Sequence, residues 1–171
     1  LASAAANSIF VLRSNGAGGW APAAAFPLPG TAPVALALGD LDGDGDLDVA
    51  SAGGVPVQGR IGRLLGDGAG DLASPLVVPV GGSALRDIAL GDVDHDGVLD
   101  AATLAVDQPL LFVSLGDGLG GFHPATSQAT AVGPVKVKLG DVDGDGRADA
   151  LVSCLDANVL SVCRGGGTGL L

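Results

Sequence analysis

Short runs in which apolar residues alternate with small or polar ones dominate this chain, and they predict β-strands rather than helices. The clearest runs are residues 34–38 (VALAL) and 135–139 (VKVKL), which alternate with a period of two residues. Glycine-rich stretches such as 66–70 (GDGAG) separate these runs. We therefore predict an all-β fold made of many short strands joined by tight turns.

Two motifs recur along the chain with a shared period of about 50 residues. The first is an acidic loop, which begins at Asp40, Asp92 and Asp141. The second is a glycine turn, whose equivalent residues are Asn15, Asp67, Asp117 and Gly166. Two different motifs that keep the same period indicate one repeated structural unit.

Each repeat is predicted to hold four antiparallel strands. The first strand ends at the acidic loop (34–39, 86–91 and 135–140), and the second strand leaves it (47–52, 99–105 and 148–154). The third strand precedes the glycine turn (60–65, 110–115 and 159–164), and the fourth follows it (75–80 and 124–131). Residues 8–13 and 22–28 are expected to be strands of an earlier unit. Units of this length and strand number match the blades of a β-propeller.

The predicted fold is therefore a partial β-propeller of about three and a quarter repeats. Residues 1–30 would be the end of a preceding blade, 31–82 and 83–132 two blades with the first and second acidic loops, and 133–171 an incomplete blade with the third. A propeller removes its exposed sheet edges by closing a ring, and these repeats are too few to close one. We expect a segment of a longer propeller, in preference to copies that assemble head to tail.

Each acidic loop carries aspartates at positions 1, 3, 5 and 9 and a glycine at position 6. The aspartates are Asp40, Asp42, Asp44 and Asp48 in the first loop, Asp92, Asp94, Asp96 and Asp100 in the second, and Asp141, Asp143, Asp145 and Asp149 in the third. Four carboxylates this close repel one another unless a cation lies between them. Calcium is expected, because it takes six to eight oxygen ligands in a flexible shell. The backbone carbonyl at position 7 (Asp46, Val98 or Arg147) would add an oxygen, which predicts three calcium sites.

An EF-hand is the obvious rival for these loops, and position 12 decides against it. An EF-hand has a bidentate glutamate there, on the helix that leaves the loop. The residues at position 12 are Ser51, Thr103 and Val152, and the chain contains no glutamate. The alternating flanks also favour strands over helices, so each loop is predicted to join two strands.

The composition of the chain disfavours nucleic-acid binding and gives no sign of a membrane span. The net charge of −11 is concentrated in the acidic loops, so bound calcium would neutralise much of it. The 8 Lys and Arg residues are scattered and aromatic residues make up only 3%, which disfavours nucleic acid as a partner. No run of 18 apolar residues occurs, so no membrane span is predicted.

Two side-chain questions stay open at the level of sequence. Cys154 and Cys163 flank the turn at 156–158, and they form either a disulfide or two buried thiols. Trp20 follows the first glycine turn, at the slot that other repeats fill with Leu72, Phe122 and Leu171. We expect this slot to pack between neighbouring blades, with a sugar-stacking platform as the alternative for Trp20.

The D-x-D-G-D-G-x-x-D loops, the LGDGLGGF turn at 115–122, and the TAPV and VGPV entries at 31–34 and 132–135 together resemble FG-GAP/VCBS repeats. These repeats are the blades of integrin α-subunit-like β-propellers, and the resemblance covers nearly the whole chain. It implies that loop positions 1, 3, 5 and 9 are calcium ligands, and that a complete ring has several more blades. His95 departs from the glycine usual at position 4.

This resemblance implies a calcium-stabilised scaffold of a secreted or cell-surface protein that mediates adhesion by binding a protein or a glycan. Extracellular modules bind calcium at roughly 10⁻⁴–10⁻³ M, so such sites argue for an exterior location. The alternative is a glycan-binding or accessory domain of a secreted hydrolase or lyase. Catalysis within the chain is not expected, because it has two histidines, no tyrosine and no glutamate, and its paired carboxylates face cations.

Overall fold

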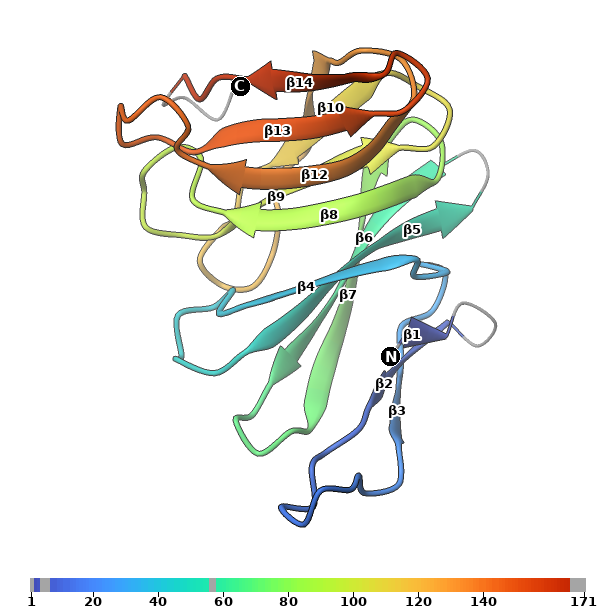
Figure 1. The fold of residues 1–171 in the computed structure, drawn as a ribbon. Coiled ribbons are helices and arrows are strands. Elements are labelled where there is room, and N and C mark those ends of the chain that lie inside the picture. The colour runs from blue at the N-terminus through green and yellow to red at the C-terminus, as the bar shows by residue number, and fades with distance from the viewer. Residues whose placement is uncertain (1, 4–6, 56–57, 167–171) are drawn as a thin grey trace.

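The computed structural model describes residues 2–3, 7–55 and 58–166, and these residues form an all-β fold without helices. Four antiparallel sheets follow one another along the molecule, with the first sheet at one end and the fourth at the other (Figure 1). The sheets do not close into a ring. The arrangement is that of successive propeller blades, which confirms the predicted fold class.

The strands follow chain order within each sheet. The first sheet holds β1 (Ala2–Ser3), β2 (Ser8–Val11) and β3 (Ala24–Pro27). The second holds β4 (Ala35–Gly39), β5 (Asp48–Val55), β6 (Gln58–Gly66) and β7 (Leu72–Gly81). The third holds β8 (Leu85–Gly91), β9 (Asp100–Ala105), β10 (Leu110–Ser114) and β11 (Thr126–Ala129). The fourth holds β12 (Pro134–Gly140), β13 (Asp149–Cys154) and β14 (Val159–Cys163).

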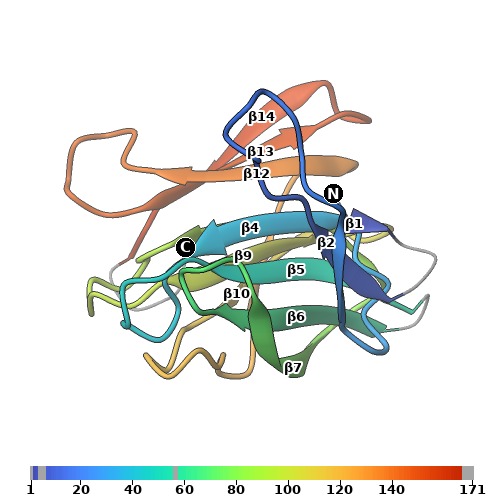
Figure 2. The same cartoon turned by 90° about the horizontal axis from the view of Figure 1, so that it is seen from below.

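Every strand predicted from the hydrophobic alternation is present. The alternation predicts strands correctly because each sheet must bury a face of apolar side chains against the next sheet. The view from below shows β4, β5, β6 and β7 side by side in chain order (Figure 2). One strand was not predicted: β1 pairs with β2 in a short register, Ala2 opposite Ile9. Residues 167–171, which include most of the fourth predicted glycine turn and Leu171, lie outside the described residues.

Three apolar cores lie between consecutive sheets. The first and second sheets share Ile9, Leu28, Val49 and Leu64. The second and third share Leu41, Ala50, Ala52, Ile61, Val80, Leu85, Ile88, Ala101, Ala105, Phe112 and Phe122. The third and fourth share Val93, Ala102, Leu104, Leu111, Val113, Val137, Ala150, Val152, Cys154 and Cys163. Alanine is common in these cores, and its small side chain lets neighbouring sheets approach closely. Close approach is needed because the chain has few aromatic side chains that could fill a wider gap.

The first strands of consecutive sheets form a row in which β8 contacts both β4 and β12. Between β8 and β12 the buried carboxylate of Asp87 accepts hydrogen bonds from Lys136 Nζ and from the Val137 N–H, both at 2.9 Å. Lys136 therefore ties the fourth sheet to the third, although its side chain is largely exposed.

The two cysteines are free and buried. In the β13–β14 hairpin Cys154 lies opposite Val159 and Cys163 opposite Ala150, so the thiols are at opposite ends of the ladder. Four residue steps of a strand span about 13 Å, too far for a disulfide. Of the two alternatives, two buried thiols are what the structure shows, and burial raises the pKa of Cys163.

The slot after the glycine turn packs between sheets as predicted for Phe122, which lies in one core, and for Leu72, which packs against another. Trp20 departs from this expectation, since it is not packed between described sheets. Its side chain is 67% exposed, whereas Phe122 in the equivalent slot is buried and Leu72 is half-buried. The described residues contain no sheet on the outer side of the first one, so nothing covers the indole. Among these residues there is also no helix long and apolar enough to cross a membrane.

Candidate metal centre

Each acidic loop joins the first strand of its sheet to the second. The loops lie between β4 and β5, between β8 and β9, and between β12 and β13. The three loops are found on the same side of the sheet stack (Figure 1). They repeat one hydrogen-bond pattern, in which each aspartate side chain accepts bonds from the backbone of its own sheet.

The aspartate at position 9 is buried in all three loops and uses both carboxylate oxygens. Oδ2 accepts the N–H of loop position 2, from Leu41 at 2.7 Å, Val93 at 2.8 Å and Val142 at 3.0 Å. Oδ1 accepts the first N–H of the glycine turn, from Gly66, Gly116 and Gly165, each at 2.8 Å. Asp48, Asp100 and Asp149 therefore fasten each acidic loop to the glycine turn of the same sheet.

The aspartate at position 1 closes the loop on itself. One oxygen accepts the N–H of position 4, and the other accepts the N–H of position 6, at distances of 2.7 to 3.0 Å. The pairs are Asp40 with Gly43 and Gly45, Asp92 with His95 and Gly97, and Asp141 with Gly144 and Gly146. The aspartates at positions 3 and 5 each accept the N–H two residues further on, at 2.8 to 3.3 Å.

Both position 4 and position 6 have left-handed backbone conformations. At position 6 the φ angles are +92° for Gly45, +87° for Gly97 and +86° for Gly146. At position 4, Gly43 and Gly144 have φ of +79° and +81°, and His95 adopts +66°. Only glycine occupies this region without strain. The need for a left-handed residue at position 4 was missed from the sequence, although the glycine in two of the three copies was a signal for it.

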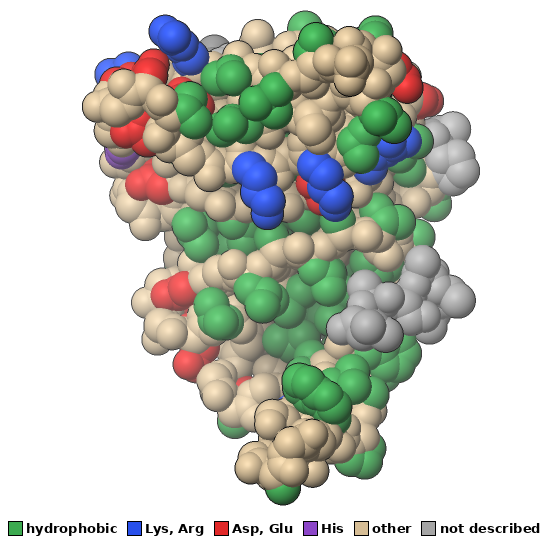
Figure 3. Space-filling model, viewed as in Figure 1, with side chains coloured by type: hydrophobic (Ala, Val, Ile, Leu, Met, Phe, Trp, Pro, Cys, Tyr) green, Lys and Arg blue, Asp and Glu red, His purple; other side chains and the backbone are tan. Residues whose placement is uncertain are grey.

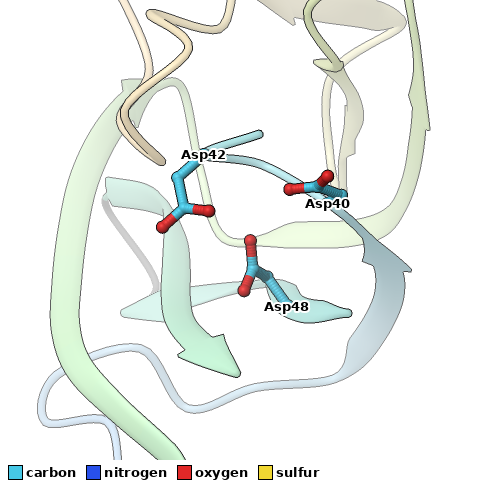
Figure 4. Close-up of side chains that lie close together, drawn as sticks. All are labelled: Asp40, Asp42 and Asp48. Carbon is cyan, nitrogen blue, oxygen red and sulfur yellow. The ribbon is translucent and has the colours of Figure 1, made fainter. Parts of the chain in front are cut away.

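Carboxylate oxygens converge in every loop. Asp40, Asp42 and Asp48 offer oxygens within 4.8 Å of one another, and their carboxylates turn toward a common point (Figure 4). The equivalent groups are Asp92, Asp94 and Asp96 in the second loop, and Asp141, Asp143 and Asp149 in the third. Of the predicted ligands, Asp44, Asp100 and Asp145 lie outside these compact groups, although each lies in the same loop as its group.

The three residues at position 7 have different surroundings. The side chain of Asp46 packs over Gly68, where a Cβ atom would collide with it. Val98 lies against Gly116 and Gly118 of its glycine turn. Arg147 lies 3.8 Å from Asp145, and Arg164 lies 3.6 Å from Asp143. The third loop therefore carries two guanidinium groups beside its carboxylates, which the other two loops lack among the described ion pairs.

Burial and backbone hydrogen bonds shift the pKa values of individual aspartates. Desolvation raises the pKa of Asp100, and the bonds from Gly116 and Val93 offset part of that rise. The pKa of Asp141 is lowered by the N–H groups of Gly146 and Gly144, since this carboxylate is exposed. Burial thus disfavours the ionised form of Asp100 although two N–H bonds stabilise it, and a bound cation would stabilise that charge further.

The glycine turns use the same local chemistry. Oδ1 of Asp117 accepts the N–H groups of Leu119 and Gly121 at 2.8 and 2.7 Å, and Asn15 holds its turn in the same way. These bonds lower the pKa of Asp117, and equivalent bonds lower that of Asp67. Beside the second turn, Arg13 forms an ion pair with Asp71 that links the first sheet to the second.

Residues 1–51 match the family model of the FG-GAP-like repeat. The chain carries an FG-GAP-like repeat. The match ends just beyond the first acidic loop and confirms the FG-GAP-like resemblance for these residues. The same loop geometry recurs at Asp92 and Asp141. A comparison with curated proteins finds no match.

The donor set fits a hard divalent cation. Every converging group is a carboxylate oxygen, and neither histidine nor cysteine belongs to the three groups among the described residues. Oxygen-only sites suit calcium, magnesium or manganese, whereas zinc and copper favour nitrogen and sulfur ligands. The three acidic loops could therefore each hold a metal ion.

Proposed function

We propose that the protein is a calcium-stabilised, propeller-like scaffold. One observation carries the proposal: three loops, in three different sheets, each bring three carboxylates together on the same hydrogen-bonded backbone. This arrangement suits calcium best, because the oxygen shell of calcium is flexible and its ligands can be spaced irregularly along a short loop. When bound, the ion would offset the mutual repulsion of the carboxylates.

The residues of each acidic loop have separate roles in this proposal. The position-1 aspartates shape the loop through two N–H bonds each, and the position-9 aspartates fasten it to the glycine turn. The residues that would hold the ion are the aspartates at positions 1, 3, 5 and 9 and the carbonyl at position 7. If free calcium is ten times Kd, each site adds about 1.4 kcal/mol, and three sites add about 4 kcal/mol.

An exterior location follows from this chemistry. Modules of this kind bind calcium at roughly 10⁻⁴–10⁻³ M, a concentration met outside cells and not in resting cytosol. The scaffold would act in a secreted or cell-surface protein, and adhesion through a protein or glycan partner is the role we propose. We expect no catalysis, because the chain has two histidines, no tyrosine and no glutamate to serve as acid, base or nucleophile.

A melting experiment tests the calcium site. We expect EDTA to lower Tm by about 8–16 °C relative to saturating calcium, using about 2–4 °C per kcal/mol for a domain of this size. Magnesium should restore little of the loss, since its rigid octahedral shell suits these loops poorly. Titration calorimetry should then show three sites, and Asp96→Ala should weaken one of them. Identical melting curves in EDTA and calcium would overturn the proposal.

The partner class needs a separate measurement. A glycan array and a panel of extracellular matrix proteins, both probed in calcium and in EDTA, distinguish an adhesion scaffold from a glycan-binding module. Binding that disappears in EDTA would support a role for the calcium-ordered loops. Binding that is unchanged in EDTA would place the partner surface away from them.

A further inference from the structure

The third acidic loop differs from the first in its charge rather than in its shape. In both loops the carboxylates at positions 1, 3 and 9 converge. In both loops the N–H groups of positions 4 and 6 donate to the aspartate at position 1. The oxygen atoms of the two loops are thus arranged alike, so a difference in their affinity for a cation comes from the residues around them.

Among the three repeats that have an acidic loop, two slots carry arginine only in the third. Loop position 7 is, in chain order, Asp46, Val98 and Arg147. The residue before the first glycine of the turn is Leu65, Leu115 and Arg164. The first loop (40–48) therefore has five aspartates and no basic residue, the second (92–100) four aspartates and a histidine, and the third (141–149) four aspartates and an arginine.

The two guanidinium groups lie beside the carboxylate oxygens that the backbone leaves free. Oδ1 of Asp143 and Oδ1 of Asp145 each accept a backbone N–H. Oδ2 of Asp145 lies 3.8 Å from Nη1 of Arg147, and Oδ2 of Asp143 lies 3.6 Å from Nε of Arg164. Among the described residues, no ion pair reaches the aspartates at positions 3 and 5 of the other two loops.

The surface of the molecule shows the same contrast between the loops. Basic and acidic side chains lie together at the corner where the loop between β12 and β13 lies, at the upper left of the space-filling view (Figure 3). The acidic side chains further down the same side have no basic neighbour in this view. The third loop is therefore the one whose negative charge is balanced by the chain itself.

These arginines oppose the binding of a cation in the third loop. Arginine keeps its charge at every physiological pH. In water, a unit positive charge about 6 Å from a divalent cation lowers its affinity by about tenfold, and salt reduces this effect to several-fold. Both side chains are exposed, at 46% and 76%, so their ion pairs are weak and a cation can displace them. The arginines thus weaken the site without abolishing it.

We propose that Arg147 and Arg164 make the third acidic loop the weakest of the three calcium sites, at least tenfold weaker than the first. The inference rests on the calcium sites proposed above and states how they differ. The charge count of a site is one of the factors that set its calcium affinity. The first two loops then fill at concentrations that leave the third mostly empty, so only the third responds to calcium in a higher range.

The test follows each site separately by NMR. The N–H of the position-6 glycine donates to the position-1 aspartate in every loop, so the amide signals of Gly45, Gly97 and Gly146 report the three sites. The 171-residue chain is labelled with ¹⁵N and titrated with calcium from about 1 μM to about 10 mM. We expect the Gly146 signal to reach its midpoint at a calcium concentration at least tenfold higher than the Gly45 signal.

Two variants replace each arginine by the residue that another repeat has in the same slot. Arg147→Val and Arg164→Leu should each lower the midpoint of the Gly146 signal by about three- to tenfold, because each removes one positive charge beside the site. Both should leave the Gly45 and Gly97 midpoints unchanged, since those signals belong to loops without an arginine.

Two controls separate charge from shape. Arg147→Lys keeps the charge at loop position 7, so it should change the Gly146 midpoint by less than about twofold. Arg86→Gln removes a positive charge from β8, outside the acidic loops, and should leave all three midpoints unchanged. Raising the ionic strength should narrow the gap between the Gly45 and Gly146 midpoints, because salt screens the arginine charges and weakens binding most in the loop with the highest negative charge.

The outcomes separate this inference from the calcium proposal. If no glycine signal responds to calcium, the calcium proposal fails and the inference fails with it. If the Gly146 signal responds at the same calcium concentration as the others or at a lower one, the loops bind calcium and only this inference is overturned. The same holds if neither arginine variant shifts the Gly146 midpoint, because the order of the sites would then have another cause.

Discussion

The second and third acidic loops share a local structure, yet their second residues have opposite surroundings. Val93 is buried between the third and fourth sheets, whereas Val142 is half exposed. Both N–H groups donate to the position-9 aspartate of their own loop at nearly the same distance. The hydrogen-bonded loop is therefore a local structure, and its burial is decided by whether another sheet covers it.

The glycines that precede the loops repeat this contrast. A Cβ atom on Gly39 would meet Leu90 and Leu99 of the third sheet, and one on Gly91 would meet Leu139 of the fourth. A Cβ atom on Gly140 would meet nothing within 4 Å. The same glycine is thus a close-packed contact in two repeats and an open position in the third, which identifies packing, not loop formation, as what distinguishes them.

Truncation of the second loop residue should give the largest effect. We expect Leu41→Ala to lower the free energy of unfolding by about 2–5 kcal/mol, since it leaves a cavity in a core. Val93→Ala should cost about 2 kcal/mol, and Val142→Ala should stay within about 0.5 kcal/mol. Urea unfolding in EDTA, at a concentration where the chain is monomeric, measures all three. Equal losses for Val93→Ala and Val142→Ala would break the comparison.

Removal of the position-9 carboxylate should be the next largest effect, and it should be alike in covered and open loops. Asp100→Ala and Asp149→Ala each leave two N–H groups without a hydrogen-bond acceptor, at a cost of about 2–3 kcal/mol in EDTA. Asp96→Ala, at position 5, should change calcium-free stability by less than about 0.5 kcal/mol and act only on calcium affinity. A calcium-free loss for Asp96→Ala as large as that for Asp100→Ala would contradict these separate roles.

Substitutions at residues with a left-handed backbone conformation should have the third largest effect. Gly97→Val places a β-branched residue at φ +87°, which should cost about 1–2 kcal/mol and weaken calcium binding more than Asp96→Ala does. His95→Gly relieves a left-handed histidine but frees the unfolded chain, so stability should change by less than about 0.5 kcal/mol. Calorimetry and thermal melts of the two variants check the order. A large loss of affinity for His95→Gly would reveal a role for the imidazole.

A pH titration should give the smallest effect. The folded-state pKa of Asp117 is lowered by N–H bonds from Leu119 and Gly121, so its contribution is present above the unfolded pKa of about 3.9. That contribution is lost as pH falls through the folded pKa, and solvent screening limits it to a few tenths of a kcal/mol. Asp117→Asn keeps the acceptor, as Asn15 does, and should flatten this part of the stability profile. An unaltered acid limb would contradict the assignment.

The sequence by itself determined the features that depend on neighbouring residues along the chain. Alternation predicted the strands, because a strand places successive side chains on opposite faces. The spacing of aspartates and glycines predicted three identical loops, and the structure brings three carboxylates together in each, from Asp40 to Asp149. These features are local, so the same short motif folds the same way in each repeat.

Tertiary structure alone decided which of these equivalent residues are buried. The hydrogen bond from Gly116 to Asp100 joins residues sixteen positions apart, and no local pattern announces it. Trp20 and Phe122 fill one slot of the repeat, but only Phe122 has a sheet against it. Burial depends on what lies across the interface, and that is set by contacts between sheets far apart in the chain.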